Sequence, residues 1–134
     1  MKHIDHIGIA VKNLEDSIAI FEALLNTVCY KKELVVSEQV TTAFLKTGET
    51  KIELLKDERE DGVINRFITK RGEGIHHIAF EVENIQEEIT RLKQEGYIFL
   101  NEEPKKGADN KLICFLHPKS ANNILIELCQ NMNS

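Results

Sequence analysis

The chain lacks the excess of basic residues that is typical of proteins that bind nucleic acids or anionic membranes. It carries 17 Lys and Arg against 22 Asp and Glu, which gives a net charge of −5. A chain with this balance has no positive field to attract polyanions. We therefore expect small molecules or other proteins as partners, with no nucleic acid and no membrane.

Long apolar runs are also absent. No stretch approaches the roughly 20 apolar residues that a membrane-spanning helix needs. The first residues, Met1–Asp5, lead into a strand-like pattern and lack the apolar segment of a signal peptide. The sequence therefore predicts a cytoplasmic protein.

Cysteine is scarce, and its spacing excludes common thiol chemistry. The three cysteines, Cys29, Cys114 and Cys129, are an odd number without a Cys-x-x-Cys pair. Two of them lie in apolar runs, where a thiol behaves as a small hydrophobic side chain. We expect buried free thiols and no catalytic cysteine.

The most informative feature that is present is an internal repeat. Three segments recur in order: His6–Leu14 as His77–Ile85 and Ala43–Leu45 as Cys114–Leu116, both 71 positions later (77 − 6), and Ile52–Leu54 as Ile126–Leu128, 74 positions later (126 − 52). A chain of 134 residues has the length of one domain. The repeat therefore predicts one domain, 1–134, built from two modules of about 1–67 and 72–134.

Each module is expected to have the order β-α-β-β-β. Runs of β-branched residues predict strands, and apolar residues at helical spacing predict helices. In the first module we expect a strand over 4–11, a helix over 14–25 capped by Asn13, and strands over 33–36, 41–47 and 50–55. In the second we expect a strand over 75–82, a helix over 85–94, and strands over 97–100, 112–117 and 124–128. A short helix over 63–70 is expected between them.

One His and one Glu recur at equivalent places in the two modules: His6 with His77, and Glu53 with Glu127. Taken singly, such residues are usually an ordinary strand imidazole and a solvent-facing carboxylate. Their recurrence favours a shared role, because pseudo-twofold symmetry can bring all four side chains to one axis. Two imidazoles and two carboxylates suit a divalent ion that keeps positions open for oxygen atoms of water or substrate. The donors are compatible with manganese, cobalt, nickel, zinc or iron.

Four motifs resemble the vicinal oxygen chelate superfamily and, within it, the methylmalonyl-CoA epimerase family: Asp5–Val11, Gly72–Phe80, Phe115–Ser120 and Leu125–Leu128. The resemblance covers nearly the whole chain. It implies an α+β fold in which two β-α-β-β-β modules form a curved open sheet around one divalent metal ion. The implied ligands are His6, Glu53, His77 and Glu127. The implied assembly is a homodimer.

The implied reaction is epimerisation of a malonyl-type acyl-CoA, through removal of the C2 proton and reprotonation of the enolate on its opposite face. Inversion requires a base and an acid on the two sides of the substrate carbon. Some family members carry a Glu on the second strand, where this chain has Thr42 and Ala43. Neither is acidic. Glu127 and Glu53 are therefore the candidate catalytic residues, provided that one of them loosens from the metal, and Glu38 is a remoter candidate.

Substrate contacts are expected at Thr42 and at lysines in or beside the polar loops. Lys111 and Lys119, with Lys105 and Lys106 nearby, are available for the phosphates of coenzyme A. The lysines that bind phosphate cannot be told by sequence from those that are merely solvated.

Two other functions within the superfamily stay open. Glyoxalase I uses a His, Glu, His, Glu ligand set on a hemithioacetal, but commonly has an Arg on the first strand, where Ile9–Val11 lie here. Antibiotic-binding members hold a small molecule without a metal and would be expected to have lost the paired His and Glu. A ring-cleaving dioxygenase would use two His and one carboxylate, which leaves one Glu without a role.

Overall fold

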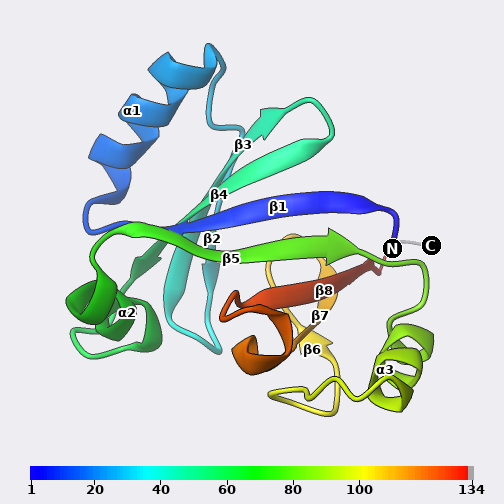
Figure 1. Ribbon diagram of the computed structural model, residues 1–134. Coiled ribbons are helices and arrows are strands. Elements are labelled where there is room, and N and C mark those ends of the chain that lie inside the picture. Colours follow the sequence, from blue (N-terminus) through cyan, green and yellow to red (C-terminus); the bar gives the residue numbers. More distant parts are fainter. Residues whose placement is uncertain (133–134) are drawn as a thin grey trace. The chain divides into compact units, whose positions relative to one another are not determined.

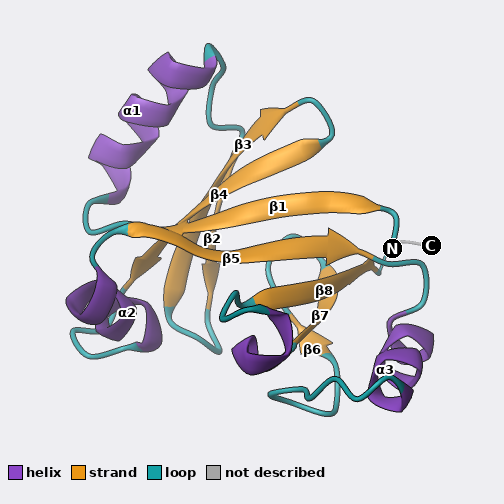
Figure 2. Cartoon of the chain, viewed as in Figure 1, coloured by secondary structure: helices purple, strands orange, loops and turns teal. Residues whose placement is uncertain are grey.

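A computed structural model describes residues 1–132 (Figures 1 and 2). The chain divides into two compact units. We call residues 6–76 the first-repeat unit, and residues 1–5 together with the chain from His77 onward the second-repeat unit. The boundaries fall within strands β1 (His3–Ala10) and β5 (Gly74–Glu81), immediately before His6 and His77.

The first-repeat unit contains the predicted strands and helices in the predicted order. After β1 come α1 (Leu14–Leu25), β2 (Lys31–Val35), β3 (Val40–Thr47), β4 (Thr50–Asp57) and α2 (Val63–Arg71). The strands lie in the order β2-β3-β4-β1; β1 runs parallel to β4 and the other neighbours are antiparallel. Helix α1 begins where predicted because the Asn13 side chain accepts a hydrogen bond from the Asp16 backbone N–H at 2.9 Å.

Helices α1 and α2 pack against opposite faces of these strands. An apolar cluster joins α1 to one face: Val11, Leu14, Ile18, Ala43, Leu45 and Leu54. A second cluster joins α2 to the other face: Ala10, Val40, Leu55, Ile64 and Ile68. Leu54 and Leu55 are neighbours on β4, so their side chains point to opposite faces. Alternation along β4 thus decides which face each helix covers.

The second-repeat unit repeats this arrangement. It contains β5, α3 (Ile85–Gln94), β6 (Lys105–Lys106), β7 (Lys111–Phe115), a 3-10 helix η1 (Pro118–Ala121) and β8 (Ile126–Asn131). The strand order is β5-β8-β7-β6, with β5 parallel to β8. Asn84 caps α3 as Asn13 caps α1, accepting from the Glu87 N–H at 3.0 Å. No helix within residues 1–132 has the length and apolar composition needed to cross a membrane.

The register of the strands confirms the repeat. Gly8 lies opposite Glu53 between β1 and β4, and Ala79 lies opposite Glu127 between β5 and β8. The offsets are the 71 and 74 positions found in the sequence (79 − 8 and 127 − 53). The predicted α+β class and the repeated β-α-β-β-β order are therefore confirmed.

The predicted strand over 97–100 is wrong. Within this segment the structure has only an isolated bridge between Phe99 and Leu116, and β6 takes the place of the second strand of the module. The backbone of the segment is held differently, because the Ile98 N–H donates to the Ser120 hydroxyl at 3.0 Å. Phe99 is buried in the core beneath α3. The apolar character of this residue therefore results from packing in the core and not from membership of a β-strand.

Candidate metal centre

The first-repeat unit brings His6 and Glu53 together. They lie on the neighbouring parallel strands β1 and β4. His6 is two residues before Gly8, which lies opposite Glu53, so both side chains lie on the same face. The His6 Nε2 atom is 3.3 Å from Glu53 Oε1, and the residues are 6% and 4% exposed.

The second-repeat unit brings His77 and Glu127 together in the same way. The His77 Nε2 atom lies 3.3 Å from Glu127 Oε1, and both residues are 4% exposed. The edge-to-face contact with Phe115, at 5.9 Å between ring centroids, holds the imidazole in place. The adjacent His76 has a different environment, since its ring packs against Phe67 of α2 at 5.0 Å.

The donors of these two pairs fit a divalent ion. Each unit buries one imidazole nitrogen and one carboxylate oxygen, which are costly to bury without a partner. Nitrogen and oxygen donors of this kind suit ions of borderline hardness. The predicted association of each His with the Glu of its own repeat agrees with this geometry, and the shared ion stays a prediction.

Thr42 lies on β3, on the same face as Glu53. It is two residues from Phe44, which lies directly opposite Glu53 on β4. Thr42 is 2% exposed, and its hydroxyl donates to the backbone oxygen of Glu33 at 3.2 Å. The hydroxyl is therefore bonded to a backbone carbonyl oxygen, which does not activate it as a base.

Lys111 lies beside the polar loop, as predicted, but its side chain is buried. It begins β7, its side chain is 6% exposed, and its Nζ lies 3.4 Å from both Asp5 Oδ1 and Glu81 Oε1. This burial and double pairing do not favour contact with a phosphate. Lys119 is exposed on η1, where its backbone N–H donates to His117 Nδ1 at 3.1 Å. The Lys119 ammonium is therefore accessible from solvent.

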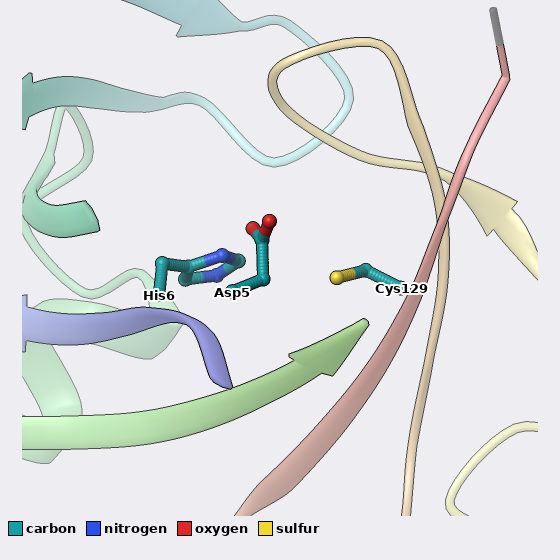
Figure 3. Close-up of side chains that lie close together, drawn as sticks. All are labelled: Asp5, His6 and Cys129. Atoms are coloured by element: carbon teal, nitrogen blue, oxygen red, sulfur yellow. The ribbon is translucent and has the colours of Figure 1, made fainter. Parts of the chain in front are cut away.

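Sequence analysis missed the buried cluster around Lys111. Its members are Asp5, Glu81, Lys111 and Cys129, and an Asp5 carboxylate oxygen lies within 4.8 Å of the Cys129 sulfur (Figure 3). His3, Asp5 and Glu81 could also offer ligands to a metal, but the Lys111 ammonium already lies beside both carboxylates. The repeat held the signal, because Glu81 and Lys111 are 71 positions after the buried Ala10 and Val40 (81 − 10 and 111 − 40).

Burial disfavours the thiolate forms of Cys114 and Cys129. Burial raises the pKa of Cys114 to about 12, and the Glu127 carboxylate adds to the shift. Burial also raises the pKa of Cys129, reinforced by Asp5. Both thiols are free and fully buried, as predicted, whereas Cys29 is only half-buried.

Comparison with known proteins agrees with this architecture. The family model described as the glyoxalase/bleomycin resistance protein/dioxygenase superfamily matches residues 5–115. The chain is 34% identical over 130 residues to the uncharacterised protein YqjC of Bacillus subtilis, covering 97% of this chain and 93% of that protein. It is 40% identical over 129 residues to the ethylmalonyl-CoA/methylmalonyl-CoA epimerase of Cereibacter sphaeroides, covering 95% of this chain and 96% of the relative.

A solved structure shows the same fold. It is a variant of Streptomyces coelicolor methylmalonyl-CoA epimerase in complex with 2-nitronate-propionyl-CoA. The match has a TM-score of 0.92 at 30% identity and covers 99% of this chain and 96% of that one. The family model spans well over half of the chain, and the relatives match nearly all of it. The chain therefore belongs to the glyoxalase/bleomycin resistance protein/dioxygenase superfamily, among relatives that include methylmalonyl-CoA epimerases.

Proposed function

We propose that this protein is a metal-dependent epimerase of a malonyl-type acyl-CoA, acting by proton transfer at C2. The observation that carries the proposal is the buried His–Glu pair, repeated at 3.3 Å in both units. The epimerase names of the relatives support it. The bound ion would supply Lewis-acid stabilisation of negative charge on the substrate oxygens.

In this proposal His6, Glu53, His77 and Glu127 hold the ion. Glu127 and Glu53 are also the candidates for the two proton transfers, because inversion needs one group on each side of C2. In this proposal a carboxylate that loosens from the ion takes the C2 proton, and the other group, in its protonated form, gives a proton to the enolate from the opposite face. Thr42 lines the same face as Glu53, and the exposed Lys119 is the preferred candidate for the coenzyme A phosphates. The cytoplasmic location and the homodimer stay predictions.

The experiment that tests the proposal is solvent deuterium uptake at C2 of methylmalonyl-CoA, with protein reloaded with cobalt or manganese. We expect rapid metal-dependent uptake and its loss in His77→Ala. His76→Ala is the matched control, because this neighbouring imidazole packs against Phe67. Uptake that persists in metal-free protein would contradict the metal-dependent mechanism.

Glyoxalase I chemistry is the second candidate, because the buried carboxylates at 53 and 127 complete the His, Glu, His, Glu set. Protein that binds the ion but exchanges no deuterium would overturn the epimerase proposal. The same preparation would then be assayed with the hemithioacetal of methylglyoxal and glutathione, or of another thiol. Protein that binds no divalent ion would instead support the non-catalytic small-molecule binding function.

A further inference from the structure

Some members of the family carry a Glu on the second strand of the first module. This chain has Thr42 at that place, so the first-repeat unit lacks the expected acidic residue. The register between β2 and β3 places Glu33 directly opposite Thr42. Residues directly opposite each other in antiparallel strands project from the same face. A carboxylate is therefore present one strand away from the expected place.

The same face carries Glu53. Thr42 and Phe44 are two residues apart on β3, and Phe44 lies directly opposite Glu53 on β4. Glu33, Thr42 and Glu53 thus project from one face across β2, β3 and β4. Figure 1 shows these three strands in the first-repeat unit. Helix α1 packs on the other face, through Ala43 and Leu54.

The Glu33 carboxylate is both accessible and oriented. Its side chain is 32% exposed, and the Lys31 Nζ lies 3.4 Å from its Oε1 atom. Lys31 also lies over the Phe44 ring, 5.7 Å from the ring centroid. The Lys31 ammonium thus lies beside both the Glu33 carboxylate and the Phe44 ring on this face.

Glu53 is less accessible to a substrate than Glu33. It is 4% exposed and lies 3.3 Å from His6, so its oxygen atoms serve the imidazole and, in the proposed function, the ion. Strands β2 and β4 are two strand spacings apart, about 10 Å. Thr42, on the strand between them, is 2% exposed, so Glu33 is the more accessible of the two carboxylates on this face.

Building on the proposed function, we propose that Glu33 is the acid–base residue of the first-repeat unit, in place of the acid missing at Thr42. The C2–H bond breaks, its proton passes to a Glu33 oxygen, and its electron pair forms the enolate. On the opposite face Glu127, in its protonated form and loosened from the ion, would donate its proton to C2. In the reverse direction Glu127 removes the proton and Glu33 returns one.

The test follows inversion and deuterium uptake separately, for each enantiomer of methylmalonyl-CoA, in cobalt-loaded Glu33→Gln. We expect inversion to fall about 100-fold or more. One enantiomer, whose proton faces the remaining carboxylate, should still exchange deuterium without inverting. Cobalt binding, measured by calorimetry, should be unchanged, which separates an acid–base role from a ligand role.

Two further variants control this experiment. Glu15→Gln removes an exposed carboxylate of α1, which covers the opposite face, and should invert both enantiomers at the wild-type rate. Adding Thr42→Glu to Glu33→Gln should recover inversion, because it puts a carboxylate one strand away on the same face. Recovery would also show that the loss in Glu33→Gln does not come from misfolding.

The outcomes separate this inference from the proposed function. If wild-type protein exchanges deuterium and Glu33→Gln inverts both enantiomers at the wild-type rate, Glu33 is not the acid–base residue and the epimerase proposal stands. A loss of cobalt binding in Glu33→Gln would likewise overturn the role assigned to Glu33. If wild-type protein exchanges neither enantiomer, the epimerase function and the role of Glu33 both fail.

Discussion

At the scale of single residues, Lys111 shows how one charge can replace apolar packing. Its repeat equivalent, Val40, packs with Ala10 and Leu55 beneath α2. Lys111 instead lies between Asp5 and Glu81, at 3.4 Å from each. A buried ion pair of this kind does not guarantee stability, but removing one partner leaves the others uncompensated.

We predict that Lys111→Ala lowers the free energy of unfolding by about 3–5 kcal/mol. The cost arises because the Asp5 and Glu81 carboxylates lose the ammonium between them. Urea denaturation measures the change. The exposed Lys119→Ala is the control, with an expected change within about 0.5 kcal/mol. A similarly small change for Lys111→Ala would show that the carboxylates do not depend on this ammonium.

Cys114 predicts a pH dependence of stability. Burial raises its pKa from an ordinary 9.0 to about 12 in the folded protein. The unfolded chain therefore loses this proton first, and stability falls as pH rises. The contribution is fully present below pH 9 and is lost progressively toward pH 12, at up to about 1.4 kcal/mol per pH unit. Urea denaturation from pH 8 to 11 should show a shallower decline for Cys114→Ala than for wild type. Parallel declines would contradict the shift.

At the scale of the secondary-structure elements, the start of α2 depends on a residue outside the helix. Gly62 precedes α2 and provides no side-chain cap. The buried Asp57 carboxylate takes this role, accepting from the Ile64 and Asn65 N–H groups at 3.0 and 3.1 Å. A Cβ atom at position 62 would overlap that carboxylate. The close approach, rather than a turn, requires glycine here.

We predict that Gly62→Ala destabilises the protein by about 2 kcal/mol or more, through overpacking and a disturbed helix cap. Urea denaturation measures the loss, with Glu60→Ala in the same loop as an exposed control. Asp57→Ala should remove the overlap, so adding Gly62→Ala to it should cost much less than Gly62→Ala alone. Additive losses would show that the two positions act independently.

The elements also show what local pattern predicts well. Helices α1 and α3 span the predicted residues, because apolar spacing and the caps Asn13 and Asn84 are local features. The segment 97–100 was wrongly predicted, since an apolar run does not distinguish a strand from a core-packed loop. β6 was missed because it comprises only Lys105–Lys106, without alternation to mark it.

At the scale of the whole molecule, the proposed centre predicts how many ions the chain binds. Four ligands that share one ion give one ion per chain, whereas two independent pairs would give up to two. We predict one cobalt or manganese ion per chain, lost in His6→Ala and equally in His77→Ala. Metal analysis after dialysis measures the ratio. Two ions, each removed by only one variant, would contradict a shared centre.

The same centre links the metal to stability. An ion that binds only the folded chain stabilises it by about 2.7 kcal/mol at a free concentration of 100 times its Kd. Thermal unfolding in the presence of the ion should therefore occur at higher temperature than in EDTA. The midpoint of His77→Ala should not respond to the ion.

The sequence by itself determined the repeat, the class of the fold, the two capped helices and the recurring His and Glu residues. These follow from periodicity, local capping and comparison of the two halves of the chain. Only the tertiary structure decided that Glu33 lies opposite Thr42 and that Lys111 reaches Asp5, 106 positions away. The physical reason is that strand register and burial are set by pairing between distant segments, so neither the face of Glu33 nor the partners of Lys111 can be read from their sequence neighbours.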